Sequence, residues 1–175
     1  MKKIVLILPL LIVIIISIFL MIFLLQGKNP QKPPSALLNK SIPEFKLENL
    51  FPDQDDITNN NLKNQKLLIN FFASWCIPCK AEHKFLVYIK NNFTNVRLVG
   101  IDHKDVKDEA LKFLKDNENP YHDVGFDKDG MVSLEFGVFG LPETFITNNE
   151  GKIIYKHLGP ITKDVLKNEI IPLLQ

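Results

Sequence analysis

Residues Leu67 to Cys79 read LLINFFASWCIPC, an apolar run that leads directly into two cysteines. A short apolar run of this kind is typical of a buried strand in a parallel sheet. The cysteines then fall at i and i+3 across the start of a helix that we expect to continue through about Asn91. Thiols placed there can interconvert between dithiol and disulfide, and the unpaired N–H groups of a helix N-terminus favour a thiolate. The stretch therefore predicts a strand–turn–helix unit with a redox centre.

The cysteine pair also has two structural interpretations. Cys76 and Cys79 could form a permanent disulfide, although so small a loop constrains the unfolded chain little. With His83 they could form half of a zinc site, but the sequence has no second CxxC motif and its other histidines lack ligand spacing. Haem attachment is excluded because Lys80 stands where a CxxCH motif requires histidine. We favour redox chemistry and expect neither a metal nor a cofactor.

The remaining pattern predicts one α/β domain over residues 41–175. Further strands are expected at Val96–Ile101, Thr144–Ile146 and Ile153–Tyr155, and further helices near Val106–Asp116 and Lys163–Leu174. A polar turn joins the last two strands as a hairpin. This order predicts a mixed central sheet that is covered by helices on both faces.

The N-terminal segment predicts a membrane anchor. Ile4–Leu25 contains no charged residue, and two lysines precede it. A membrane span needs about 20 apolar residues, whereas the apolar part of a cleaved signal peptide has about 7–15. We therefore predict an uncleaved transmembrane signal anchor over residues 1–27, with cleavage near Gly27 as the alternative, and a polar linker over residues 28–40. The lysines favour a cytoplasmic N-terminus, which leaves the domain where disulfides persist.

The charge balance excludes one class of partner. The chain has 21 Lys and Arg residues against 20 Asp and Glu residues, which gives a formal net charge of +1. Binding to nucleic acid usually depends on a basic surface. We therefore expect no nucleic-acid partner.

Two segments resemble the active-site region of thioredoxin. FASWCIPC, from Phe72 to Cys79, resembles its active-site motif, and the Gly140–Thr144 loop resembles its second element, in which a proline follows a cis peptide bond. In that fold the peptide before the proline pairs with the substrate backbone, so that the substrate adds a short strand. The resemblance implies a thioredoxin-like fold with substrate contacts from Trp75, Leu141 and the cis proline Pro142.

Other segments narrow this resemblance to the CcmG/DsbE-type proteins of cytochrome c maturation. These segments are Ala73–His83, Asn119–Tyr121, Phe126–Met131, Gly137–Phe145, Tyr155–Gly159 and Glu169–Leu173. The resemblance covers about residues 41–175 and includes the N-terminal anchor. The stretch from His103 to Phe136 is longer than thioredoxin connectivity needs, and it fits the inserted strand–helix element of this family.

The resemblance implies a disulfide reductase on the bacterial inner membrane, with its soluble domain in the periplasm. Such a protein would reduce the disulfide of an apocytochrome c CxxCH segment, directly or through a partner thiol protein, before haem is attached. Its electrons would come from a membrane thiol transporter. A reductase of broad specificity with the same fold is the first alternative, and a Cys/His metal-binding module is the second.

The residues also suggest how the reaction proceeds. We expect Cys76, nearer the helix start and more exposed, to attack the substrate disulfide, and Cys79 to resolve the mixed disulfide. Thioredoxin carries a buried aspartate six residues before its first cysteine, but Asn70 stands there and an amide cannot accept the proton of the resolving thiol. We therefore expect Glu82, at i+3 from Cys79, or Glu143, directly after Pro142, to handle that proton.

Overall fold

The structure is a computed structural model that describes residues 2–25 and 36–175. The chain divides into two compact units, Met1–Pro33 and Pro34–Gln175. In the first unit, helix α1 spans Lys2–Leu25. Within the described ranges, no helix is both long enough and apolar enough to cross a membrane. The anchor predicted over residues 1–27 stays a prediction, and Gly27 and most of the predicted linker over 28–40 lie outside the described residues.

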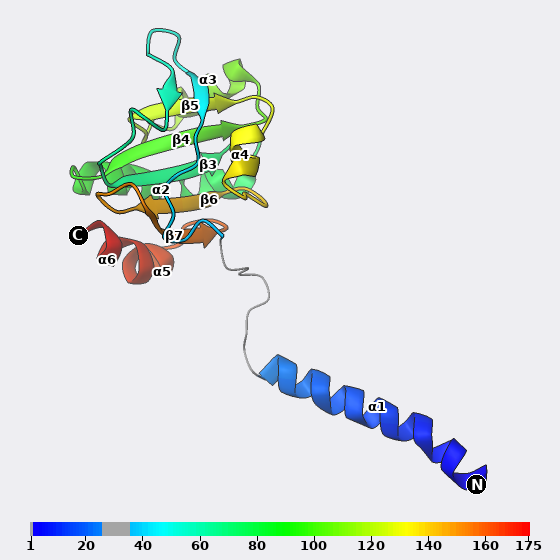
Figure 1. Cartoon of the computed structure of the whole chain (residues 1–175). Coiled ribbons are helices and arrows are strands. Elements are labelled where there is room, and N and C mark those ends of the chain that lie inside the picture. Colours follow the sequence, from blue (N-terminus) through cyan, green and yellow to red (C-terminus); the bar gives the residue numbers. More distant parts are fainter. Residues whose placement is uncertain (1, 26–35) are drawn as a thin grey trace. The chain divides into compact units, whose positions relative to one another are not determined.

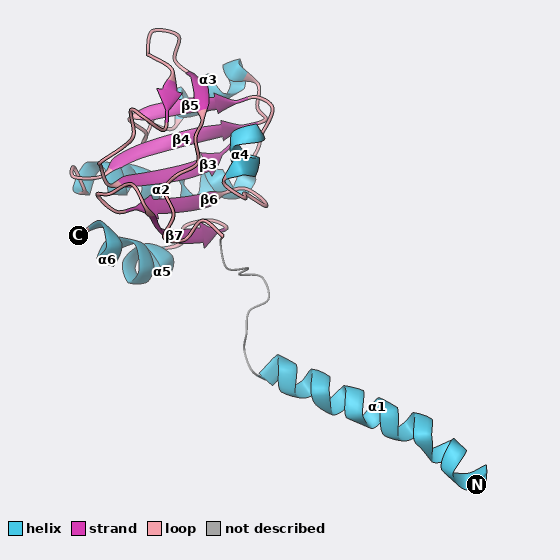
Figure 2. Cartoon of the chain, in the orientation of Figure 1, coloured by secondary structure: helices cyan, strands magenta, loops and turns pink. Residues whose placement is uncertain are grey.

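The second unit is built on a seven-stranded mixed sheet with the order β2-β1-β5-β4-β3-β6-β7 (Figures 1 and 2). Strands β3, β4 and β5 run parallel to one another, and the other neighbouring pairs are antiparallel. The strands are β1 Lys46–Asn49, β2 Ile57–Thr58, β3 Leu67–Phe72, β4 Arg97–His103, β5 Asp123–Asp127, β6 Glu143–Thr147 and β7 Ile153–Leu158. Every residue of β3 is buried, as its apolar sequence predicts.

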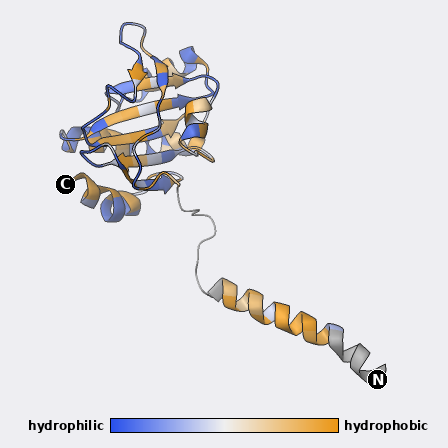
Figure 3. Cartoon of the chain, in the orientation of Figure 1, coloured by the Kyte–Doolittle hydropathy of each residue, from blue (hydrophilic) through white to orange (hydrophobic). Residues whose placement is uncertain are grey.

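Helices cover both faces of this sheet. They are α2 Ile77–Asn92, α3 Lys107–Asp116, α4 Met131–Glu135, α5 Lys163–Val165, the π-helical turn η1 Leu166–Ile170 and α6 Ile171–Leu174. Parallel crossovers are right-handed, so the β3–α2–β4 and β4–α3–β5 connections place α2 and α3 on one face. Their apolar side chains share a core with the C-terminal helical segment. The opposite face packs against α4 and the chain that precedes β3. Figure 3 shows apolar residues concentrated in the central strands.

The alternation of side chains along β3 places one polar residue beneath α2. Leu68 and Phe72 belong to the core that contains α2, whereas Ile69 and Phe71 belong to the core of the opposite face. Successive side chains of a strand point to opposite faces. Asn70 therefore points toward α2, into the core that contains both cysteines.

The structure confirms the predicted mixed sheet and adds elements that the sequence pattern did not indicate. These are β1 and β2, at one side of the sheet, which are too short to show a clear periodicity. In the stretch between His103 and Phe136, where the resemblance implies an inserted strand–helix element, the structure contains β5 and α4. The predicted closing helix is interrupted by η1, where the N–H of Ile171 bonds to the carbonyl of Leu166. Pro172 has no N–H to continue the α-helical ladder at this point, which accounts for the break.

Candidate active site

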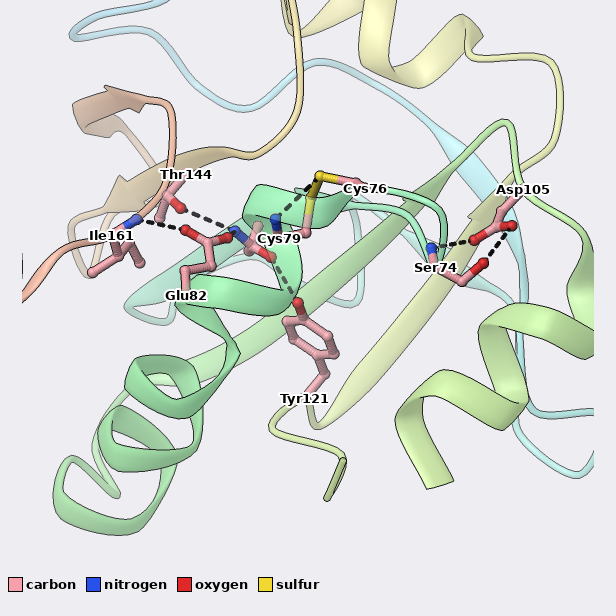
Figure 4. The surroundings of a disulfide bond; sticks show 9 residues. Ser74, Cys76, Cys79, Glu82, Asp105, Tyr121, Thr144 and Ile161 are labelled. Atoms are coloured by element: carbon pink, nitrogen blue, oxygen red, sulfur yellow. Dashed lines mark hydrogen bonds between the residues drawn. A yellow bond between two sulfur atoms is a disulfide. The ribbon is translucent and has the colours of Figure 1, made fainter. Parts of the chain in front are cut away.

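The two cysteines form a disulfide at the start of α2 (Figure 4). Cys76 is the N-cap of this helix, and the backbone N–H of Cys79 donates a hydrogen bond to Cys76 Sγ at 3.2 Å. This N–H is one of the donors that a helix N-terminus leaves unpaired, and it would stabilise negative charge on the same sulfur in the reduced protein. The contact favours Cys76 as the attacking thiolate.

Both cysteines are nearly buried, with Cys76 4% exposed and Cys79 2% exposed. The expectation of an exposed Cys76 is therefore wrong for the disulfide form, because its side chain packs in the core cluster that contains Ala73 and Cys79. The exposed side chains are instead those of the sequence neighbours Trp75 and Ile77. The turn that carries the disulfide thus exposes one aromatic and one aliphatic side chain.

A buried hydrogen-bond network lies beside the disulfide and is centred on Asn70. Its Nδ2 donates to Glu82 Oε1 at 2.8 Å and to Thr144 Oγ1 at 3.0 Å. Its Oδ1 accepts a hydrogen bond from the Tyr121 hydroxyl at 2.6 Å. The neutral amide therefore connects β3 with α2, with β6 and with the segment before β5. An amide suits this position because it both donates and accepts without burying a charge.

Glu82 supplies the acidic group of this network. Its carboxyl group is completely buried, and its Oε2 accepts a hydrogen bond from the N–H of Ile161 at 2.7 Å (Figure 4). Burial raises the pKa of Glu82 to about 7, although the hydrogen bonds from Ile161 and Asn70 oppose this rise. A carboxyl group that changes charge near neutral pH, one helical turn after Cys79, can accept or donate a proton.

Glu143 lies on the opposite face of the sheet. In the β3–β6 ladder, Glu143 pairs with Phe71 and Thr144 pairs with Asn70, and paired residues share a face. Glu143 Oε1 accepts hydrogen bonds from the N–H groups of Phe139 and Gly140 at 2.8 and 3.3 Å. These contacts argue against the proton-handling role suggested by the sequence, because they direct the carboxylate into the loop before β6.

That loop contains the predicted cis proline. The Leu141–Pro142 peptide bond is cis, and the Pro142 carbonyl accepts a hydrogen bond from the N–H of Gly159 at 2.9 Å. Because β6 runs antiparallel to β3, the start of β6 lies beside the end of β3. The structure therefore brings the residues around Pro142 next to the turn that carries the cysteines, where Trp75 is exposed and Leu141 is half-buried.

Comparison with known proteins identifies the family. Residues 37–170 match the family model described as Redoxin. The chain belongs to the Redoxin family. This Redoxin chain is 38% identical over 181 residues to the thiol:disulfide interchange protein DsbE of Escherichia coli strain K12, covering 99% of the chain and 95% of that relative. It is 37% identical over 153 residues to the thiol:disulfide interchange protein HelX of Rhodobacter capsulatus, covering 87% and 85% respectively.

The Redoxin chain also has structural relatives. It superimposes on the thioredoxin domain of a thiol-disulfide oxidoreductase from Bacteroides vulgatus with a TM-score of 0.68 and 20% identity, covering 81% of this chain and 100% of that one. This likeness shows a thioredoxin-like fold. By its similarity to these sequence relatives, the chain is an enzyme. It is a thiol:disulfide interchange protein of the DsbE/HelX type and carries the pair Cys76 and Cys79.

The side chain of His83 contacts the end of α3. Its Nε2 lies 2.9 Å from the carbonyl oxygens of both Asn117 and Glu118, and its ring packs edge-on against Phe113. The side chain thus connects α2 to the end of α3. Among the described residues, no group of three or more His, Cys, Asp or Glu side chains could hold a metal ion. The metal-binding alternative therefore gains no support from the position of His83.

A buried aspartate near the redox site was not found from the sequence. Asp102 is completely buried in β4, and neither of its carboxyl oxygens has a hydrogen-bond partner. Burial, together with the neighbouring Asp105 and Asp127, raises the pKa of Asp102 to about 9. Asp105 in turn accepts hydrogen bonds from the N–H and hydroxyl groups of Ser74, just before the cysteine motif (Figure 4). Asp102 is therefore a neutral acid at physiological pH.

Proposed function

We propose that this protein is a reductant in cytochrome c maturation that reduces the disulfide of an apocytochrome c CxxCH segment, directly or through a partner thiol protein. The observation that carries the proposal is the cysteine pair at the start of α2, where the N–H of Cys79 contacts Cys76 Sγ. The resemblance to CcmG/DsbE-type proteins and the DsbE and HelX relatives support the cytochrome pathway.

The reaction begins from the dithiol form. The Cys76 thiolate attacks one sulfur of the substrate disulfide, a mixed disulfide forms, and the second substrate sulfur leaves as a thiolate. Glu82 accepts the proton of the Cys79 thiol, and the resulting thiolate attacks Cys76 Sγ. The first substrate sulfur then leaves, so two electrons pass to the substrate and Cys76 and Cys79 end as a disulfide. The burial of Glu82 supports this role because it raises the pKa of the carboxyl group to about 7.

The loop before β6 would bind the substrate polypeptide. In this proposal the substrate extends alongside the peptide that precedes Pro142 and pairs with its backbone, as in other β-augmentation complexes. Trp75 and Leu141 would contact its side chains. The antiparallel register of β3 and β6 supports this arrangement because it brings the loop and the cysteines to the same end of the sheet.

The proposed reductase is anchored in the bacterial inner membrane with its soluble domain in the periplasm. The absence of charged residues from Ile4 to Leu25 supports this location. A reductant in an oxidising compartment needs a continuous supply of electrons, which we assign to a membrane thiol transporter. A fractionation experiment tests the location: the full chain should stay with the membranes at high salt and alkaline pH, whereas a chain that begins at residue 36 should not.

Capture of a covalent partner tests the proposed substrate. The Cys79→Ser variant lacks the resolving thiol, so we expect it to accumulate a mixed disulfide with apocytochrome c or a maturation thiol protein. The adducts are identified by mass spectrometry after non-reducing electrophoresis, and Cys76→Ser is the matched control. Capture of many unrelated secreted proteins would instead support the broad reductase. Equal yields of adduct from the two variants would contradict the assigned order of attack.

A further inference from the structure

A buried lysine supports the loop before β6 from within the sheet. Lys156 lies in β7, where it pairs with Phe145 of β6. Glu143 precedes Phe145 by two residues along β6, so Lys156 and Glu143 lie on the same face of the sheet. Its side chain is only 7% exposed, and its Nζ lies 2.9 Å from Glu143 Oε2. The same Nζ donates a hydrogen bond to the Gly137 carbonyl at 2.7 Å. One ammonium group thus contacts both ends of the segment from Gly137 to Glu143.

The carboxylate of Glu143 completes this support. Its Oε1 accepts hydrogen bonds from the consecutive N–H groups of Phe139 and Gly140, at 2.8 and 3.3 Å. Consecutive N–H groups are a common way for the backbone to bind an anion. Lys156 and Glu143 together therefore hold the carbonyl at the start of the loop and two N–H groups in its middle. We call residues 137–142 the recognition loop.

Burial of the Lys156–Glu143 ion pair costs hydration free energy, which suggests that the pair serves a purpose other than stability. Two charges removed from water lose their hydration, and a buried ion pair often stabilises a protein no more than apolar residues of the same volume. Such a pair is more informative about geometry, since its hydrogen bonds admit few loop conformations. A loop that must present its backbone to another polypeptide requires this kind of fixed geometry.

The recognition loop also exposes an aromatic side chain directly above the ammonium group. Phe139 is 78% exposed, and its ring centre lies 5.0 Å from Lys156 Nζ. A cation on one face of a ring attracts it and restricts its orientation. The ring is thereby held while most of its surface remains available to a partner. Exposed aromatic side chains beside a binding loop commonly provide contact area to polypeptides.

We propose that Lys156 is a positioning residue for the recognition loop, and that Phe139 is the side chain with which this loop contacts an apolar residue of a polypeptide substrate. The inference rests on the proposed reduction of a polypeptide disulfide at Cys76. It assigns Glu143 to the shape of the loop and leaves the proton of Cys79 to Glu82. Substrates with an apolar residue near the reacting cysteine are the class that this surface recognises.

The Lys156→Met variant tests the positioning role, because methionine keeps the apolar stem and removes the charge. The substrates are an oxidised peptide with one CxxCH disulfide and a small aromatic disulfide that has no peptide backbone. For the peptide we expect KM to rise by about 10- to 100-fold, with a much smaller change in kcat. The equilibrium of the Cys76–Cys79 pair with glutathione should stay within about twofold of the wild type. Lys156→Arg keeps the charge and should restore most of the peptide KM.

Two further variants separate positioning from general stability. Lys152→Met removes an exposed lysine that forms an ion pair with Glu150 just before β7, and it should behave as the wild type. If Lys156→Met alone does not fold, the double variant Lys156→Met/Glu143→Gln leaves no unpaired buried charge, yet the peptide KM should remain raised. Phe139→Ala should raise KM for peptides with an apolar residue beside the cysteine and leave KM for an all-polar peptide unchanged.

Three outcomes would overturn the proposal or locate its failure. An unchanged peptide KM in a folded Lys156→Met protein would exclude a positioning role. An equal loss of rate with the peptide and with the small disulfide would show a general structural effect and would also exclude it. If the wild type reduces the small disulfide but no CxxCH peptide, the proposed substrate itself is wrong.

Discussion

Replacement of Asp102 by asparagine should stabilise the protein, and the gain should grow as the pH rises from about 5 to about 8. Burial raises the pKa of Asp102 to about 9, with further contributions from Asp105 and Asp127, whereas an aspartate of the unfolded chain titrates near pH ~3.9. Between these values the folded protein holds one more proton than the unfolded chain. The free energy of unfolding therefore falls with rising pH, by up to about 1.4 kcal/mol per pH unit.

Asparagine resembles the protonated acid in shape and does not ionise, so the Asp102→Asn variant escapes this loss. The gain in the free energy of unfolding at pH 7 should be about 2–3 kcal/mol. It is smaller than the full pH-dependent loss of the wild type, because part of the polar surface of the buried asparagine amide stays unpaired. Urea denaturation at several pH values measures the gain as the difference between the two proteins. The control is Asp53→Asn, which replaces an exposed carboxylate. Its stability difference from the wild type should not grow with pH in this way. A stability difference that does not change with pH would contradict the prediction.

Replacement of Glu82 by glutamine should slow the resolution of the mixed disulfide by about 10- to 100-fold above neutral pH. In the wild type, burial raises the pKa of Glu82 to about 7, so the carboxylate that we propose as the acceptor of the Cys79 proton is abundant above this pH and scarce below it. The rate of resolution should therefore fall as the pH decreases through about 7. Glutamine cannot accept the proton, and the variant should lose this inflection.

Single-turnover release of reduced peptide, followed across the pH range, measures the effect. The matched control is Glu135→Gln, which changes an exposed carboxylate in α4 and should keep the wild-type profile. Urea denaturation of both variants shows whether the hydrogen bonds of Glu82 to Asn70 and Ile161 contribute to stability as well. A Glu82→Gln protein that retains the inflection near pH 7 would exclude Glu82 as the proton acceptor.

The parts of the site that could be predicted are those encoded by short-range sequence. The apolar run, the spacing of Cys76 and Cys79, and the position of Glu82 one turn later depend only on a strand and a helix that are adjacent in the chain. The cis bond before Pro142 was implied by the resemblance and is confirmed. These features need no knowledge of which strands are neighbours.

The remaining parts depend on strand register, which the sequence pattern does not provide. Glu143 and Lys156 meet because β6 and β7 pair as they do, and a shift of one residue would turn Lys156 to the other face. Asp102 is buried in β4, where it pairs with Phe72 of β3 and Phe126 of β5, and no local pattern distinguishes it from the exposed acids of this chain. The burial of Cys76 depends on how the turn before α2 packs into the core, which the spacing of the two cysteines does not specify.

The sheet lies between two carboxylates that the sequence treats as equivalent. Glu82 belongs to the face with the thiols, and Glu143 belongs to the face with the recognition loop and Lys156. In the proposed mechanism, transfer of the Cys79 proton and positioning of the recognition loop therefore use two different carboxylates on opposite faces of the sheet. We therefore expect substitutions in the recognition loop to change which polypeptide is bound, while the exchange chemistry of Cys76 and Cys79 is retained.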